Sequence, residues 1–158
     1  MSYIPLRFYY DRREKAGVSD VKKVSPLYLK YLEFYQVDVS GKDPESFIKA
    51  RIENEESVVY YATDESGRTL GFAQLYPLFC SLEMRKIWLL YDLYVDSSQR
   101  KRGIGERLLE QADQLAKETD SAFVMLSTGI DNKTAQSVYE KHGYVRDVEF
   151  YNYVHMLK

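Results

Sequence analysis

Apolar and polar positions along the first third of the chain predict one strand and two helices. Ile4–Tyr10 is rich in aromatic and β-branched residues, a composition typical of a strand. From Ser19, a helix-capping residue, apolar residues recur at helical spacing. We expect Pro26 to break or restart this helix, because proline has no backbone N–H. A second helix is predicted to begin near residues 43–44, where proline suits the first helical position.

The middle of the chain predicts three strands. Val58–Thr63 and Thr69–Phe79 flank the polar loop Asp64–Gly67, whose glycine suits a hairpin turn. Arg85–Val95 contains the nearly continuous apolar run Ile87–Leu90, which indicates a strand buried on both faces. We expect these strands to belong to one sheet.

The last third of the chain alternates between helical and strand patterns. Gly103–Lys117 carries apolar residues on one helix face, and Ala122–Ser127 is strand-like. A last helix, capped at residues 131–132, is expected to end at Gly143, because glycine accepts the left-handed conformation that stops helices. Tyr144–Leu157 alternates enough to supply one or two further strands.

These elements predict an α+β fold in a single domain spanning residues 1–158, with a mixed central β-sheet flanked by about four helices. The net charge of −2 argues against a nucleic-acid partner, which requires a broad basic surface. No apolar run approaches the ~20 residues of a membrane-spanning helix, so no membrane partner is expected. A single cysteine, Cys80, gives no internal disulfide and no metal-ligand spacing, and a cytoplasmic location is the simplest expectation.

A turn with two glycines lies between a predicted strand and a predicted helix, at Arg100–Gly105. Glycines let backbone N–H groups approach a ligand, and the start of a helix attracts anions, so a phosphate or pyrophosphate is the expected occupant. The dinucleotide fingerprint needs a third glycine where Leu108 stands, and the P-loop needs lysine and a hydroxyl residue where Glu106 and Arg107 stand. Both of those sites are therefore excluded.

The remaining pattern, Arg-x-x-Gly-x-Gly, resembles the turn of the GCN5-related N-acetyltransferase (GNAT) family. The segment Tyr91–Val95 is similar to the strand that precedes the turn in that family. Downstream, Asn132-x-x-Ala135-x-x-x-Tyr139-Glu140-Lys141-x-Gly143-Tyr144 resembles the family's next signature. Roughly residues 58–157 follow the family pattern, and the first fifty match only in element order. The resemblance implies a GNAT-like fold and acetyl-CoA as the acetyl donor.

The resemblance also implies which residues bind acetyl-CoA. The pyrophosphate would be held by the turn and the first helical N–H groups, and the pantetheine arm would pair with the preceding strand, one of whose N–H groups would lie near the thioester oxygen. The expected cofactor-binding residues are Leu93, Tyr94, Val95, Arg100, Lys101, Arg102, Gly103, Ile104, Gly105, Glu106, Asn132, Ala135 and Lys141.

Two residues are the candidates for catalysis. Tyr139 is assigned to protonating the departing thiolate, because its ordinary pKa near 10 keeps it protonated at neutral pH. The alternative is a core aromatic that packs on Tyr144.

Asp92 is the candidate for the substrate side, as a base acting through water or as a partner of an ammonium group; a purely structural acceptor is the alternative. Family members of the spermidine type have Glu where this chain has Tyr91. The resemblance therefore gives less support for a carboxylate base in this chain. Glu33 is a second candidate.

The acceptor site is expected among tyrosines, of which the chain has 15. Tyr31 and Tyr35 share a helix face, and Tyr76 and Phe79 end a strand near the expected acceptor entrance. Aromatic faces attract cations, although packing of the helix stripe on the sheet explains the same spacing. The two histidines and Cys80 lack companions for nucleophilic catalysis.

We therefore predict an acetyl-CoA-dependent N-acetyltransferase that acts on a primary amine of a small molecule, such as a polyamine or amino acid, by direct attack. The alternatives are a non-catalytic acyl-CoA-binding module and an acetyltransferase for peptide N-termini or lysines. The segment Tyr151–Val154 is apolar enough for a dimer contact. A homodimer would explain this apolar character, and so would a buried strand that closes the sheet.

Overall fold

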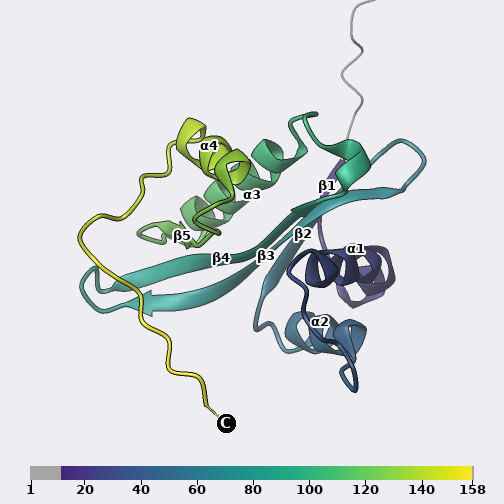
Figure 1. Ribbon diagram of the computed structural model, residues 1–158, viewed down its shortest axis with the longest axis horizontal. Coiled ribbons are helices and arrows are strands. Elements are labelled where there is room, and N and C mark those ends of the chain that lie inside the picture. Colours follow the sequence, from purple (N-terminus) through teal and green to yellow (C-terminus); the bar gives the residue numbers. More distant parts are fainter. Residues whose placement is uncertain (1–11, 158) are drawn as a thin grey trace, which may run out of the picture. The chain divides into compact units, whose positions relative to one another are not determined.

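A five-stranded sheet in the order β1-β2-β3-β4-β5 organises the first part of the chain (Figure 1). The computed structural model describes residues 12–157, and the expected strand Ile4–Tyr10 lies outside them. Of the described residues, 12–127 form one compact unit and 128–157 form a second. Each unit is described by itself, and the single domain expected from the sequence stays a prediction.

The sheet is mixed. Its strands pair antiparallel, except that β4 and β5 run parallel, as a connection through a crossover helix allows. β2 and β4 have the bounds that the sequence predicts, and β5 is shorter because only three of its residues pair with β4. The strands are β1 (Arg12–Lys15), β2 (Val58–Thr63), β3 (Thr69–Cys80), β4 (Arg85–Val95) and β5 (Val124–Leu126).

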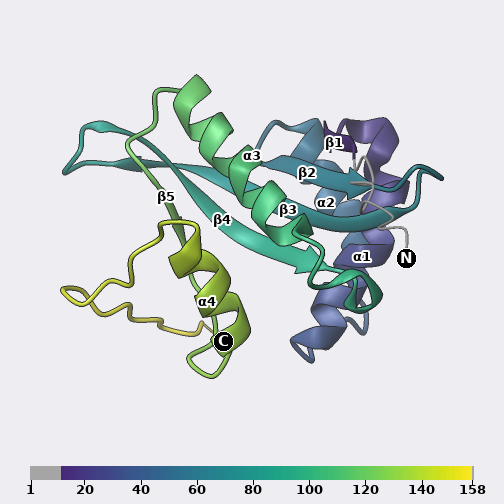
Figure 2. The same cartoon turned by 90° about the horizontal axis from the view of Figure 1, so that it is seen from above.

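Helices cover both faces of this sheet (Figure 1 and Figure 2). α1 (Val21–Phe34) and α2 (Pro44–Glu53) lie on one face, and α3 (Ile104–Glu118) lies across the other. Two single 3₁₀ turns, η1 (Val18–Asp20) and η2 (Ser97–Gln99), precede α1 and α3. None of the helices within residues 12–157 is both long enough and apolar enough to span a membrane.

Proline does not interrupt α1, so the expected break at Pro26 is wrong. Pro26 is exposed, whereas Val24 and Leu27 on either side are buried against the sheet. The carbonyl that loses its hydrogen bond to proline therefore faces water, and packing of the apolar face holds the helix together. Ser19 is not the cap, because it lies inside η1 and α1 begins at Val21.

α3 fits the prediction closely. Its five predicted apolar positions are all buried, and Leu109 is buried with them. The helix starts close to the sheet because residue 71 is glycine: a Cβ there would lie 2.9 Å from the Tyr94 carbonyl oxygen and 3.1 Å from Cγ2 of Ile104. The buried positions on α3 are Ile104, Leu108, Leu109, Ala112, Leu115 and Ala116.

The second unit contains one helix, α4 (Lys133–Lys141), followed by an extended segment. The strands expected in Tyr144–Leu157 are wrong for the described residues, which form none. The Asp147 carboxylate accepts the N–H groups of Glu149 and Phe150, at 2.8 and 3.1 Å, and so bends the chain instead. A sequence of alternating apolar and polar residues forms a strand only where a neighbouring strand supplies hydrogen-bond partners for its backbone. The dimer contact predicted for this segment stays a prediction.

Candidate active site

The turn between β4 and α3 is built around a buried carboxylate. Asp96 is 4% exposed and accepts hydrogen bonds from the Ser98 N–H at 3.0 Å and the Ser98 hydroxyl at 2.7 Å. The Lys30 ammonium, from α1, lies 2.7 Å from its other oxygen. The hydrogen bond from Lys30 and those from Ser98 hold the pKa of Asp96 well below its usual range. The carboxylate therefore stays ionised and fixes the path of the chain into the turn.

The start of α3 is open to an anion. Gly103 adopts the left-handed conformation, with φ +75°, and no side chain caps the helix there. The first helical hydrogen bond at this end runs from the Arg107 N–H to the carbonyl of Gly103, the N-cap residue, at 3.1 Å, so the preceding N–H groups point out of the helix end. A Cβ on Gly105 would have 3.9 Å to its nearest neighbour, Cγ2 of Val95, which leaves room for a ligand.

Three cations surround this helix start, as the sequence predicts. Arg100, Lys101 and Arg102 are all exposed. The Arg100 guanidinium lies over the Phe34 ring, 5.9 Å from its centroid, and Arg102 donates a hydrogen bond to the Gln99 side chain. Positive charge beside free helical N–H groups suits a phosphate or pyrophosphate.

The end of β4 has a free edge on the β5 side. β4 pairs with β5 only at Trp88–Leu90, so within the described chain residues 91–95 have no strand partner on that side. On the other side the register with β3 shifts: Gln74 pairs with Asp92 and Leu75 with Leu90, which leaves Tyr91 as an extra residue in a bulge. A linear ligand with amide groups can add to such an edge as a strand does.

A buried hydrogen-bonded chain ends at Asp92. The Ser57 hydroxyl donates to the Gln74 side-chain oxygen at 2.8 Å, and the Gln74 amide donates to Asp92 at 2.7 Å. Asp92 is 4% exposed. Burial raises the pKa of Asp92, and the hydrogen bonds from Gln74 and Tyr31 oppose that rise. A carboxylate with a raised pKa is a better proton acceptor than an ordinary one.

Asp92 forms part of the wall of an aromatic groove between α1, α2, β3 and β4. The groove has a volume of about 520 Å³, within the usual range of ligand sites. It brings together Asp92 with the predicted Tyr31, Tyr35 and Tyr76, whereas Phe79 is 83% exposed and does not line it. Lining residues are Tyr28, Tyr31, Leu32, Tyr35, Val37, Phe47, Tyr76, Leu78, Leu89, Tyr91 and Asp92.

Three tyrosines of the groove have pKa values above their ordinary range. Burial, and then the nearby Asp92 charge, raise the pKa values of Tyr28, Tyr31 and Tyr76. Tyr31 also packs against Phe72 and Tyr94, with ring centroids 6.1 and 6.3 Å away. Tyr31 therefore packs on the sheet, as one interpretation of this helix stripe expects, and also lines the groove; its role in binding an amine stays a prediction. Glu33 is exposed and does not line it.

The remaining predicted residues belong to the second unit. The Asn132 side-chain oxygen accepts the Ala135 N–H at 3.2 Å and so caps α4. Asn132, Ala135 and Tyr139 are half-buried on the same helix face, and Lys141 is exposed. The Tyr139 ring lies 6.1 Å from that of Tyr144, as the packing alternative expects. The role of Tyr139 in proton transfer stays a prediction.

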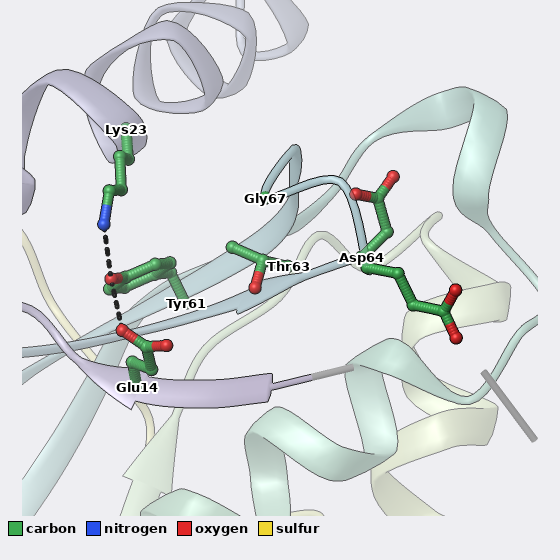
Figure 3. Close-up of a pocket in the computed structure, with 7 residues that line it drawn as sticks. Glu14, Lys23, Tyr61, Thr63, Asp64 and Gly67 are labelled. Atoms are coloured by element: carbon green, nitrogen blue, oxygen red, sulfur yellow. Dashed lines mark hydrogen bonds between the residues drawn. The ribbon is translucent and has the colours of Figure 1, made fainter. Parts of the chain in front are cut away.

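A second pocket of about 520 Å³ lies beside β1 and β2 (Figure 3). Its polar groups bond to one another: the Tyr61 hydroxyl lies 2.8 Å from Glu14, 3.1 Å from Asp20 and 3.5 Å from Lys23. Burial and these carboxylates raise the pKa of Tyr61 to about 12. The cluster joins α1 to β1 and β2, and we assign it a structural role. Within residues 12–157 no group of His, Cys, Asp and Glu side chains could hold a metal ion.

Three contributors to the site were missed from the sequence: Gln74, Lys30 and Gly71. Gln74 and Lys30 contact their carboxylates across 18 and 66 positions, and no local signal marks such partners. Gly71 matters only because α3 approaches it. The hydrogen bond between Asp96 and Ser98 could have been predicted from the sequence, since Asp followed two residues later by Ser is a common turn pattern.

Comparisons with known proteins agree with this geometry. A sequence model of the acetyltransferase (GNAT) family matches residues 24–144, from α1 through α4. The uncharacterized N-acetyltransferase YhfO of Bacillus subtilis (strain 168) is 40% identical over 139 residues, 88% of this chain and 93% of that protein. A crystal structure of a probable acetyltransferase, 38% identical, covers 93% of this chain and 98% of its own, with a TM-score of 0.85. Human N-alpha-acetyltransferase 30 is 38% identical over 80 residues, 48% of this chain and 22% of that protein.

Proposed function

The chain belongs to the acetyltransferase (GNAT) family, and from that premise we propose that it transfers the acetyl group of acetyl-CoA to a primary amine of a small molecule by direct attack. As a family member it is an acyltransferase of the N-acetyltransferase type. The fold predicted from the resemblance is confirmed. The observation that carries the proposal is the buried Asp92 carboxylate, which lines an aromatic groove and precedes the open strand edge and the uncapped helix start.

The residues around the turn fit an acyl-coenzyme A. The N–H groups at the start of α3 and the cations Arg100, Lys101 and Arg102 would hold the pyrophosphate, and the free edge at Leu93–Val95 would pair with the pantetheine arm. By family resemblance, Asn132, Ala135 and Lys141 add contacts. When bound, acetyl-CoA supplies the acetyl group as an activated thioester.

Two residues of the chain then transfer protons: one removes a proton from the acceptor's ammonium group, and the other supplies a proton to the thiolate. Asp92, whose raised pKa makes it a competent base, accepts a proton from the acceptor's ammonium group, directly or through water. The freed amine would form the new N–C bond as the C–S bond breaks, and its nitrogen would then lose a second proton to water, which resupplies the Tyr139 hydroxyl. A backbone N–H of the β4 edge would donate to the thioester oxygen, where negative charge develops. Tyr139 would give its hydroxyl proton to the departing thiolate.

Similarity to human N-alpha-acetyltransferase 30 favours a second candidate acceptor, the α-amine of a peptide N-terminus. That similarity covers 48% of this chain, and the same groove would receive the amine. A cytoplasmic location, consistent with the lone Cys80, belongs to the proposal as well.

The test is release of free thiol from acetyl-CoA against a panel of amines, with polyamines, amino acids, aminoglycosides and short peptides. We expect acceptor-dependent release by the wild-type protein and a loss of about a hundredfold or more in Asp92→Asn. Tight acetyl-CoA binding without acceptor-dependent release would instead establish a non-catalytic binding module.

A further inference from the structure

On the basis of the proposed function, we propose that the groove selects a primary amine with one positive charge on an apolar or aromatic body, as in phenethylamine or pentylamine. The chemistry of the described lining residues carries this assignment. Ten of the eleven are uncharged aromatic or aliphatic side chains, and Asp92 is the eleventh.

The charges of the groove fit one ammonium group. Among its described lining residues Asp92 is the single charged side chain, and it is buried. The nearby Arg51 guanidinium lies over the outer ring of Phe47, 4.9 Å from its centroid, and its Nε is bonded to Glu56 at 2.5 Å. Arg51 is therefore held outside the lining. One ammonium group neutralises Asp92, and a second charge on the acceptor finds no second carboxylate among the described lining residues.

The walls fit the rest of such an acceptor. Two edge-to-face aromatic pairs flank the carboxylate: Tyr31 with Tyr35, at 5.0 Å between ring centroids, and Tyr76 with Tyr91, at 5.7 Å. Aromatic faces attract a cation electrostatically and bury apolar surface at the same time. Leu32, Leu78 and Leu89 complete an apolar surface for the body of the amine.

Other amine classes conflict with this lining. Polyamines and aminoglycosides carry several ammonium groups, each of which needs an anionic or strongly polar partner on binding. A free amino acid places a carboxylate beside its amine, where it meets Asp92 and no cation. A peptide N-terminus brings amide groups that need hydrogen-bond partners among mostly apolar side chains.

The experiment compares matched acceptors with acetyl-CoA at saturation. Phenethylamine is paired with phenylalanine and with a short peptide that begins with phenylalanine, and pentylamine is paired with 1,5-diaminopentane and spermidine. We expect kcat/KM for each monoamine to exceed that of its partners by at least about tenfold. Equal or better use of the amino acid, the peptide or the polyamine overturns the assignment.

A matched pair of variants tests whether the groove itself selects. Val37 lines the groove and is 41% exposed, whereas Val18 is 42% exposed in η1 and does not line it. We expect Val37→Arg to shift preference towards phenylalanine over phenethylamine by about tenfold, because it adds a cation for the carboxylate. Val18→Arg adds the same charge elsewhere and should leave the preference unchanged. An equal shift in both variants, or in neither, contradicts the assignment.

Binding separates failure of this assignment from failure of the proposed function. Phenethylamine and phenylalanine are titrated calorimetrically into the protein saturated with coenzyme A. Tighter binding of phenethylamine, lost in Asp92→Asn, supports the assignment even where no amine is acetylated, an outcome that would contradict only the proposed catalysis. Tighter binding of phenylalanine, or no binding of either, overturns the assignment.

Discussion

At the scale of single residues, the site depends on a carboxylate that the fold keeps out of water. Asp92 is buried, is held by Gln74, and lies near Tyr31 and Tyr76, whose pKa values are raised by burial first and by the Asp92 charge second. The same burial that makes Asp92 a better base makes its ionised form unfavourable for folding. Function and stability therefore oppose each other at this position.

Asp92→Asn should lose activity and gain stability at neutral pH. Because the folded-state pKa is raised, the native protein binds more protons than the unfolded chain just above the ordinary carboxyl pKa. Wild-type stability from this group is therefore greatest at low pH and falls as pH rises through the folded-state pKa. Urea denaturation across pH should show the variant's advantage growing over that range and then levelling off. A variant less stable at pH 7 than at pH 4, relative to wild type, contradicts this account.

The raised pKa of Asp92 also predicts how catalysis depends on pH. Only the ionised carboxylate accepts a proton, so kcat/KM of the wild type should fall as pH drops through the raised pKa. The same profile in Asp92→Asn should lack that limb.

Tyr139→Phe should lower kcat by about a hundredfold while KM for acetyl-CoA stays unchanged, because in the proposed mechanism the hydroxyl acts on the leaving thiolate and not on binding. Steady-state kinetics at saturating acetyl-CoA provide the measurement. The control is Tyr153→Phe, the same change at a tyrosine that is 91% exposed. Unchanged turnover in Tyr139→Phe removes that residue from the mechanism.

At the scale of elements, two glycines near the start of α3 have different purposes: Gly71 lies in β3 beneath the helix, and Gly105 lies in its first turn. Gly71 lets α3 pack against the sheet, and Gly105 leaves space above the helix start. The first serves packing and the second serves the ligand, although both are small residues in the same region.

Alanine substitutions separate these two purposes. Gly105→Ala should keep or raise the free energy of unfolding, by about 0.5–1 kcal/mol, and weaken acetyl-CoA binding. Gly71→Ala should lower the free energy of unfolding by about 1–3 kcal/mol, because its Cβ overlaps the Tyr94 carbonyl oxygen. Denaturation and calorimetry measure both quantities, and a Gly105→Ala protein that binds acetyl-CoA normally contradicts the site.

The Asp96 contacts should stabilise the turn in a pH-dependent way. Asp96→Ala removes its bonds to Ser98 and Lys30, and we expect a loss of about 2 kcal/mol in the free energy of unfolding at pH 7. Because the folded-state pKa is lowered, this stabilisation is present above the ordinary carboxyl pKa and disappears as pH falls through the folded value. Lys30→Met removes only the pair with a half-exposed lysine, which solvent screens, and should lower the free energy of unfolding much less than Asp96→Ala does.

At the scale of the whole molecule, the donor and acceptor regions that we propose in the first unit meet along β4. The strand's free edge leads to the anion site, and its bulge carries Asp92 into the groove. Binding of acetyl-CoA should therefore stabilise the folded protein by mass action.

We expect a rise of several degrees in melting temperature when acetyl-CoA exceeds its Kd a hundredfold, equivalent to about 2.7 kcal/mol. Pantetheine, which lacks the pyrophosphate, should produce a much smaller rise at the same concentration. High salt should weaken acetyl-CoA binding, because exposed arginine and lysine side chains hold the phosphates. Equal rises with both compounds would remove the anion site from the account.

The sequence by itself determined the local features of this protein. The strands β2 and β4, the start of α2 at residues 43–44, the apolar face of α3 and the two-glycine turn are set by patterns of neighbouring residues, so they could be predicted. The family followed from motifs of the same local kind.

Only the tertiary structure decided what depends on distant partners. It kept α1 intact through Pro26, because buried neighbours outweigh one lost hydrogen bond on an exposed face. It left Tyr144–Leu157 without strands, because alternation needs a partner strand. It also joined Asp92 to Gln74 and enclosed it with tyrosines from α1, β3 and β4, which raises the pKa that the proposed chemistry uses. Burial and long-range contacts belong to the folded chain and have no local signature.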